Sequence, residues 1–473
     1  MRKIGKRSVL LVTSCLLAGC AAHRYRPVPI VPATTASQFE SRSLADAGLR
    51  SFEEQNLGHS VSPWPPNGWD LQTLSLAALY FNPVLDLARA RLSTAEGALK
   101  SAHARANPTF DLTPGIPAPY LLTQDFLFLI ETAGKRGLRV QIAKDLHQAA
   151  QFDLADAAWT VAMGVRVALL NYLVASRNLG LLQSEQKARA DQVAILEQIL
   201  RAGENTRFDV DLARIELSKT TAAIRTAEVQ VADAKSALAA AIGVPTAAID
   251  GAEFSWPEMD TLPSADSLSV DRIRRDAVLN RLNIRRALAQ YAASEADLHS
   301  EIAKQYPNFN FGPGYTYEER NSFFTLGFST SLPIFNRNEG PIAEAEGRRE
   351  QAAAAFLQTQ AQVIENSERA LGVYKAALRA FMETESSYQL QESQLKIVEH
   401  NISAGADDRL SLDAVEIQVS ALAQARLNAL ARAQGAFGGL EDSLQRPLVL
   451  GEVVFPLNSE SRGLGTLPQR RKQ

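Results

Sequence analysis

The sequence predicts a mainly α-helical protein with a small β component, in which one unit of roughly 200 residues occurs twice. Segment 106–115 aligns with segment 305–314, and segment 201–213 aligns with segment 403–415 at nearly the same offset. In addition, two long stretches are poor in proline and rich in Ala, Leu, Gln and Glu. Two independent matches in one register make a duplication the best explanation of the pattern.

Each unit begins with a predicted helix, over about 71–105 and about 270–304, where apolar and Ala residues recur at spacings of three and four. Asn107-Pro108 ends the first of these helices and Tyr306-Pro307 ends the second. The reason is that proline disfavours the helical conformation of the residue before it.

A much longer helix is predicted in the second part of each unit, over about 138–201 and about 341–403. At 1.5 Å per residue each would be roughly 90 Å long. Helices of this length do not fit into a compact domain and must pack side by side. Each is expected to end at a glycine, Gly203 or Gly405, and to return as a second helix. Every unit therefore carries a predicted helical hairpin.

Two short segments with period-two alternation lie between the helices of each unit. Residues 308–317 and 324–331 place aromatic side chains on one face and small polar ones on the other, which is typical of membrane β-barrel strands. The first unit shows the pattern more weakly, because 121–130 alternates poorly. A half-buried hairpin of a water-soluble protein would give the same alternation, and this alternative stays open. The candidate lipid-facing residues are Phe309, Phe311, Phe324, Leu326 and Phe328.

The number of strands has a consequence for assembly. Four strands cannot close a barrel, and an open sheet edge cannot lie in lipid because its backbone groups would have no hydrogen-bond partners. If the strands lie in a membrane, several chains must share one barrel.

The first residues of the chain predict an export signal. Arg2 and Lys3 precede an apolar stretch, 8–17, that is too short to span a bilayer stably. Segment 17–20 resembles the lipobox of bacterial lipoproteins, which implies cleavage before Cys20 and its acylation, with palmitate among the chains. Ala21, in place of the Asp that marks retention in the inner membrane, favours the outer membrane. A plain secretory signal is the alternative.

These features together give the expected organisation of the chain. It comprises a lipoprotein signal peptide at 1–19, a proline-containing lipid-anchored tether at 20–68, two repeats at 69–265 and 266–447, and a C-terminal tail at 448–473.

Charge and motif content exclude several functions. The formal net charge is -3, with 49 basic and 52 acidic residues, so nucleic acid is not an expected partner. The six histidines are isolated, without the spacing of a metal-binding pair. The motifs of nucleotide-binding loops, serine hydrolases and zinc proteases are missing from the sequence. We therefore expect no enzyme activity, no cofactor and no metal site.

In combination, segments 306–309, 326–329, 332–336 and 342–345 resemble the TolC-like outer-membrane efflux proteins, and the resemblance extends over about 69–447. It implies a homotrimer whose strands form a twelve-stranded β-barrel, continuous with an α-helical tunnel that extends into the periplasm. It also implies a passive efflux channel whose partners are outer-membrane lipid, a periplasmic adaptor (membrane fusion) protein and an inner-membrane pump.

The resemblance further implies a gate of acidic residues at the periplasmic end of the tunnel. Asp413 matches one of the two acidic positions of the family, whereas Leu410 replaces the other, and Asp211 is the repeat counterpart of Asp413. Asp407 and Asp408 are further candidates, because a ring of carboxylates would repel anions and concentrate cations. Capping of the following helix is the alternative for Asp407 and Asp408.

Glu131, Gly134, Lys135, Arg136 and Arg139 resemble the Glu-x-x-Gly-Lys-Arg-x-x-Arg motif of heavy-metal efflux members of the CzcC type. The resemblance suggests divalent heavy-metal cations as cargo. The physical role predicted for the motif is contact with lipid headgroups or phosphates at the membrane surface. A lipid-anchored periplasmic coiled-coil scaffold or adaptor without its own pore is the rival function.

Overall fold

The computed structural model describes residues 25–115, 121–265 and 268–448, so Cys20 and most of the predicted tail lie outside the described residues. The chain divides into two compact units, 1–42 and 43–473, which are treated separately. Among its described residues, the first unit contains the exposed helix α2 (Pro32–Glu40). The second contains both repeats.

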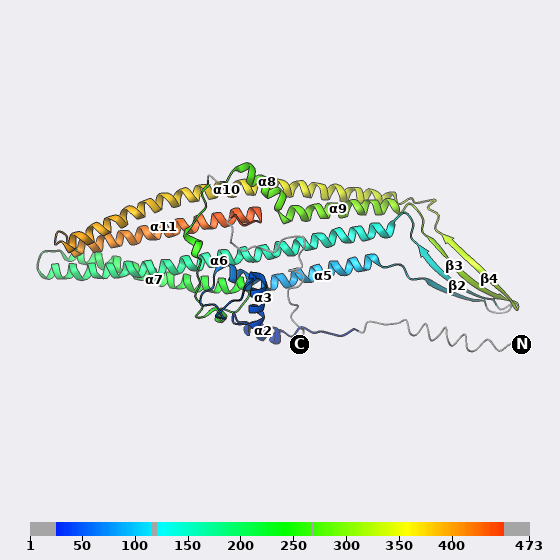
Figure 1. The fold of residues 1–473 in the computed structure, drawn as a ribbon, viewed down its shortest axis with the longest axis horizontal. Helices are drawn as coiled ribbons and strands as arrows, with labels where there is room; N and C mark the ends of the chain where they lie inside the picture. Colours follow the sequence, from blue (N-terminus) through cyan, green and yellow to red (C-terminus); the bar gives the residue numbers. More distant parts are fainter. Residues whose placement is uncertain (1–24, 116–120, 266–267, 449–473) are drawn as a thin grey trace. The chain divides into compact units, whose positions relative to one another are not determined.

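Each repeat runs through the same order of elements (Figure 1). In the first repeat these are α4 (Leu71–Phe81), α5 (Pro83–His103), β1 (Thr109–Gly115), β2 (Leu121–Ile130), α6 (Lys135–Arg201) and α7 (Arg207–Ile242). In the second they are α8 (Val270–Asn280), α9 (Leu282–Ala303), β3 (Phe309–Glu318), β4 (Asn321–Thr330), α10 (Glu339–Ser403) and α11 (Arg409–Leu444). The predicted mainly α fold with two repeats is confirmed.

The first predicted helix of each repeat is wrong in one respect, because it is two helices in the structure. Asn82, ahead of Pro83, and Arg281 both have extended backbones, with ψ of 123° and 127°. Each break contacts the end of its own hairpin: Asn82 donates from Nδ2 to the carbonyl of Ala241 at 2.9 Å, and Arg281 from Nη1 to that of Ser443 at 2.9 Å. Proline explains the first break, whereas the second depends on tertiary contacts.

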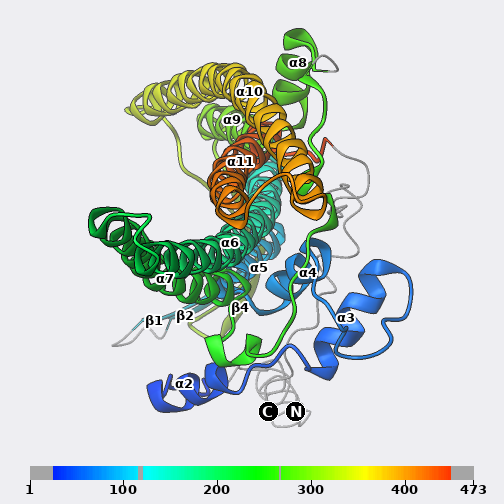
Figure 2. The ribbon, with the colours of Figure 1, turned by 90° about the vertical axis from the view of Figure 1, so that its left-hand side faces the viewer.

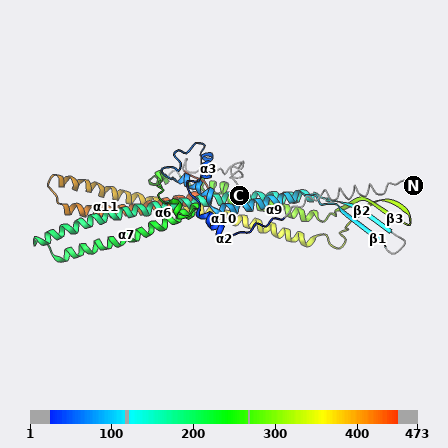
Figure 3. The ribbon, with the colours of Figure 1, turned by 90° about the horizontal axis from the view of Figure 1, so that it is seen from below.

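The long helices and their returns form the two predicted hairpins (Figure 3). Gly203 and Gly405 adopt φ of 84° and 74°, the left-handed conformation expected just after a helix end. α6 packs against α11, whereas α7 contacts α6 and α10 contacts α11. The four helices of the two hairpins therefore lie in the order α7, α6, α11, α10, with α7 and α10 at opposite flanks (Figure 2).

α6 also contains a stretch that is long and apolar enough to cross a bilayer by composition alone. Half of that stretch is buried inside the protein, as expected for the core helix of a bundle. Its neighbours α5, α7, α9 and α11 cover it along its length.

A buried charge network joins the repeats near the middle of the bundle. Arg166 of α6 pairs with Glu441 of α11, with Nη1 and Oε2 3.2 Å apart, and both side chains are buried. The Arg166 guanidinium also lies over the ring of Trp256, 4.7 Å from its centroid, in the linker between the repeats. Gln434 donates to the carbonyl of Met259 in the same linker at 2.6 Å. The linker is thus fixed to helices of both repeats.

Residues 43–68, part of the expected tether, contain a helix that was not predicted from the sequence. α3 (Ala47–Leu57) buries Leu49 and Phe52 against α4. Asp46 caps its N-terminus by accepting from the amides of Gly48 and Leu49. This helix has no counterpart before α8.

Candidate functional site

The four strands form one antiparallel sheet in the order β1-β2-β3-β4. The register places Phe311 opposite Phe328, and Tyr315 opposite Phe324. Because side chains alternate along each strand, all four strands contribute to one aromatic face, including the poorly alternating β2. Its members are Phe110, Leu112, Phe126, Phe128, Ile130, Phe309, Phe311, Tyr315, Tyr317, Phe324, Leu326 and Phe328.

The predicted lipid-facing residues all lie on this face. Phe324 is 88% exposed, and Leu326, Phe328 and Phe311 are exposed as well. Phe309 is half-buried, since its ring stacks on Phe328 at a centroid distance of 5.3 Å. The single chain thus presents a continuous apolar surface to its surroundings.

The opposite face of the sheet is more polar. Asp111 lies directly opposite Asp125, and Gly314 opposite Thr325. A Cβ at Gly314 would collide with the Asp125 carboxylate and the Thr325 hydroxyl. Glycine at this position therefore leaves room for the Asp125 and Thr325 side chains. One face is therefore suited to hydrocarbon and the other to water.

β1 and β4 are the edges of the sheet. Each pairs with a single neighbour among the described strands. Their outward backbone N–H and C=O groups remain available for another strand.

The Glu131–Arg139 motif lies where β2 passes into α6, and its charged side chains bind protein atoms. Arg139 and Glu131 form a two-fold ion pair, with Nη1–Oε1 and Nη2–Oε2 distances of 2.7 and 3.1 Å. Arg139 also donates from Nε to the carbonyl of Ala102, and Arg136 donates from Nη2 to that of His103 at 2.7 Å. These carbonyls form the C-terminal end of α5, which attracts positive charge. The hydrogen bond from Arg139 also lowers the pKa of Glu131, despite a partial loss of solvation.

The same segment holds the start of β3. Lys135 donates from Nζ to the carbonyl of Tyr306 at 2.5 Å and to Oδ1 of Asn308 at 2.6 Å. Thr132 donates from its hydroxyl to the carbonyl of Pro307 at 2.7 Å. Lys135 and Arg139 were predicted to contact lipid headgroups. In the structure, both side chains bind protein atoms instead. Lys135 thus joins the junction of the first repeat to the start of β3 in the second, whereas Arg139 contacts residues of the first repeat.

The junction of the second repeat is built differently. Asn338, with φ of 65°, precedes α10 as Gly134, with φ of 70°, precedes α6. Asn338 donates from Nδ2 to the carbonyl and the carboxylate of Glu301, at 2.7 and 2.9 Å. One amide thus contacts the end of α9, where the first repeat uses charged residues.

The candidate gate residues at the hairpin tips do not form one cluster. Asp408 caps α11, since its Oδ1 accepts the amide of Ser411 at 2.8 Å, and this bond lowers the pKa of Asp408. Asp407 is partly buried and accepts the amide of Asp408 at 2.9 Å. Capping is therefore the observed role of Asp408, as the alternative predicted.

Asp413 and Asp211 occupy equivalent repeat positions but different environments. The side chain of Asp211 is 58% exposed, with Arg214 3.6 Å away. Asp413 is 0% exposed, and burial raises the pKa of its carboxyl even though Arg409 opposes this shift. In this conformation Asp413 is therefore not a solvent-facing carboxylate.

Two residues near Asp413 escaped the sequence analysis. Arg409 has Nε 3.2 Å from Asp413 Oδ1 and Nη2 3.4 Å from Asp191 Oδ2 on α6. It therefore connects the second hairpin to the first. Arg409 could have been found from its spacing of four residues before Asp413 on one helix, whereas Asp191 requires the packing of α6 on α11.

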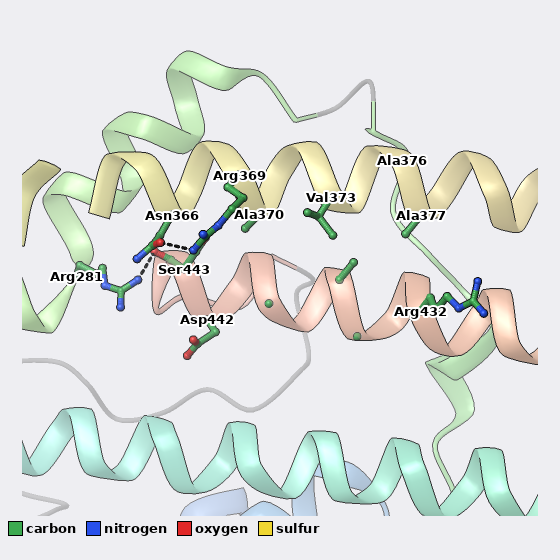
Figure 4. Close-up of a pocket in the computed structure, with 13 residues that line it drawn as sticks. Arg281, Asn366, Arg369, Ala370, Val373, Ala376, Ala377, Arg432, Asp442 and Ser443 are labelled. Carbon is green, nitrogen blue, oxygen red and sulfur yellow. Dashed lines mark hydrogen bonds between the residues drawn. The ribbon is translucent and has the colours of Figure 1, made fainter. Parts of the chain in front are cut away.

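A shallow groove between α10 and α11 lies on the exposed side of the second hairpin (Figure 4). Small residues line it, with Val373 at its centre and Arg369 and Arg432 at its rim. The small residues are Ala370, Ala376, Ala377, Gly435, Ala436 and Gly439. Within the described ranges, no group of three or more His, Cys, Asp or Glu side chains could hold a metal ion.

Comparisons with known proteins agree with this architecture. A family model described as outer membrane efflux protein matches residues 122–244. The chain is 24% identical over 323 residues to the cobalt-zinc-cadmium resistance protein CzcC of Cupriavidus metallidurans, covering 66% of this chain and 74% of that protein. It is 23% identical over 353 residues to the nickel-cobalt-cadmium resistance protein NccC of Alcaligenes xylosoxydans xylosoxydans, covering 72% and 76%.

The fold has solved counterparts. The outer membrane protein VceC of Vibrio cholerae matches with a TM-score of 0.64 at 21% identity, covering 80% of this chain and 97% of that one. The family model covers β2 from its second residue and the whole first hairpin. The chain is therefore similar to outer membrane efflux proteins over residues 122–244, to CzcC in sequence and to VceC in fold.

Proposed function

We propose that the protein is the outer-membrane channel of a tripartite efflux system and works as a homotrimer. The observation that carries this proposal is a four-stranded sheet with one aromatic face, one polar face and two unpaired edges. Such a sheet is stable in lipid only when another chain pairs with each edge. The smallest ring, of two copies, would have eight strands and an interior filled by side chains. Three copies would supply twelve strands and a water-filled lumen.

The helices support the same ring. α7 exposes Phe208, Leu212 and Ile215, which share one helix face, and α10 exposes Leu390 and Ile397, seven residues apart. The two stripes lie on opposite flanks of the chain. Joining the α10 flank of one copy to the α7 flank of the next gives a head-to-tail contact, which closes into a ring when the rotation is suitable.

In this trimer, substrate crosses without chemistry, and a periplasmic adaptor and an inner-membrane pump supply the energy. Divalent heavy-metal cations are the proposed cargo, supported by the names of CzcC and NccC. Asp111 and Asp125 on the polar face are suited to cations. Zinc and cobalt tolerance of cells with and without the gene tests the cargo, and unchanged tolerance to both metals would contradict it.

We further propose that acylated Cys20 anchors the chain in the outer membrane. Labelled palmitate should enter the wild-type protein and not the Cys20→Ser variant. Labelling of both proteins would contradict an anchor at this residue.

The channel is tested by conductance of the purified protein in planar bilayers, together with its mass in detergent. We expect stable conductance and a trimer. Phe208→Glu combined with Leu212→Glu should dissociate the trimer, because charges would enter an apolar contact. Arg225→Glu, exposed on another face of α7, is the matched control. A silent, water-soluble monomer after removal of the lipid would instead favour the scaffold or adaptor.

A further inference from the structure

The segment that follows β4 exposes three large apolar side chains. Leu332 is 66% exposed, Ile334 67% and Phe335 100%. They directly follow the edge strand, at the end of the sheet that adjoins the helices (Figure 1). Neighbouring large apolar side chains that are all exposed usually mark a surface that contacts a membrane or another protein.

The aromatic face of the sheet is too short to match a membrane by itself. From Phe309 to Tyr317 it extends about 26 Å along the strand, at 3.3 Å per residue. With a strand tilt of about 40°, this gives about 20 Å of membrane thickness, against an apolar band of about 25 Å for outer-membrane barrels. The missing part, roughly 5 Å, corresponds to two further residues along a tilted strand.

The segment after β4 is in the place to supply these residues. Thr330 lies opposite Phe309 and interrupts the even-numbered apolar residues at this border of β4. Leu332 continues the even-numbered series of Phe324, Leu326 and Phe328. The apolar surface therefore extends past the last strand residue by the required length.

The residues around the segment are of the kind found at a membrane–water boundary. Tyr306, before β3, is 61% exposed, and its ring is apolar with a polar tip. Arg337 is exposed, and no ion pair or hydrogen bond engages its side chain among the residues that the structure describes. Lys135 and Arg139, by contrast, are bound to protein atoms. Leu332 and Phe335 also line a cleft together with Tyr306 and Lys304.

We propose that Leu332, Ile334 and Phe335 form an interfacial anchor that inserts into the periplasmic leaflet of the outer membrane, with Arg337 reaching the phosphate headgroups. This inference rests on the proposed function, because it requires the sheet to be a lipid-embedded barrel. It assigns the headgroup contact to a segment of the second repeat, where the sequence motif had suggested the first. A long cationic side chain beside apolar anchors is the usual arrangement at such a boundary.

The test is quenching of an introduced tryptophan in the full-length protein, in phosphatidylcholine vesicles whose acyl chains carry bromine. Bromine is placed near the headgroup in one lipid and near the chain end in another. The variants are Phe335→Trp, Phe328→Trp on the aromatic face, and Ser329→Trp on the polar face as control. The signal of the four native tryptophans is subtracted with the wild-type protein.

We expect brominated lipid to quench Phe335→Trp and Phe328→Trp, and not Ser329→Trp. Phe335→Trp should respond more to bromine near the headgroup. If only Phe328→Trp is quenched, the anchor is overturned and the barrel stands; acrylamide then separates exposure to water from burial against a second copy. If neither variant is quenched, the lipid-embedded barrel itself is overturned.

Discussion

The two repeats share their order of elements but differ at the junction between strand and long helix. The first junction uses Glu131, Lys135 and Arg139 to bind the end of α5 and the start of β3. The second has Asn338 in the equivalent place and leaves Leu332 and Phe335 exposed. The same junction is thus held by contacts within the chain in the first repeat, whereas in the second repeat it leaves apolar side chains exposed to an external partner.

The same contrast occurs at the hairpin tips. Asp211 is exposed beside Arg214, whereas its counterpart Asp413 is buried beside Arg409 and near Asp191. At the position of Asp413, therefore, a charge contact through Arg409 links the second hairpin to α6 of the first, whereas Asp211 pairs with a residue of its own helix. The repeats share their order of elements, but equivalent residues have different surroundings.

The largest expected effect comes from the network that joins the repeats. Arg166→Met should reduce the free energy of unfolding by about 3 to 5 kcal/mol, because Glu441 would remain as a buried charge without its partner. Arg177→Met is the matched control, since Arg177 also binds the linker, through Asp260 at 3.1 Å, but in solvent. Thermal unfolding of the purified variants measures both. Equal losses would contradict a special role of the buried pair.

The stability of α3, the helix that precedes the first repeat and has no counterpart before the second, should depend on pH. Glu53 of α3 is buried, its oxygens lack hydrogen-bond partners among the described residues, and burial together with Asp70 raises its pKa to about 8. Its ionised form is disfavoured in the fold, so stability should fall as pH rises from the ordinary pKa of 4.5 towards 8. The loss at α3 is expected to be on the order of 5 kcal/mol.

Hydrogen exchange of the amides of α3 as a function of pH measures this effect. Glu53→Gln should remove the dependence between pH 5 and 8, an interval of about three pH units. Glu54→Gln is the control, since Glu54 is bound to Arg50 and its pKa is lowered. A pH dependence that persists in Glu53→Gln would show that another group titrates.

The junctions can be compared directly by substitution. Arg139→Gln should reduce the free energy of unfolding by about 1 to 2 kcal/mol, a charged hydrogen-bond loss discounted for partial exposure. Asn338→Gly keeps the left-handed backbone available and should cost less than about 1 kcal/mol. Adding Glu131→Gln to Arg139→Gln should cost less than the sum of the single changes. Additive losses in the thermal midpoint would contradict a paired contact.

The sequence predicted the parts of this structure that depend on local pattern. The two repeats, the glycine-ended hairpins and the aromatic face follow from period and spacing, so they could be found without coordinates. The break at Arg281 could not, because no proline marks it and Gln445, a distant residue, accepts the amide of Leu282. The carbonyl partners of Lys135 and Arg139, at Tyr306 and Ala102, were missed for the same reason, since they lie far along the chain.

Substitutions at Asp413 and Asp211 are expected to have the smallest effect on stability. They are the most informative test of how the channel opens. The raised pKa of Asp413 means that its ionised form is disfavoured where it is buried. The buried arrangement should therefore be favoured at low pH and weaken as pH rises from the ordinary pKa of 3.8 towards the raised pKa. If the channel opens by separating α11 from α6, conductance in planar bilayers should increase over that range.

Asp413→Asn imitates the protonated form and should keep conductance low at all pH values, since an amide loses less on burial than a carboxylate. Asp211→Asn should keep the pH response, because Asp211 is exposed in this arrangement. The nearby charges of Arg409, Asp191 and Glu416 set the balance at Asp413, so Arg409→Gln should shift the response towards opening. If Asp211→Asn abolished the pH response while Asp413→Asn retained it, the gate would belong to the first hairpin, and the contrast between the two repeats would be reversed.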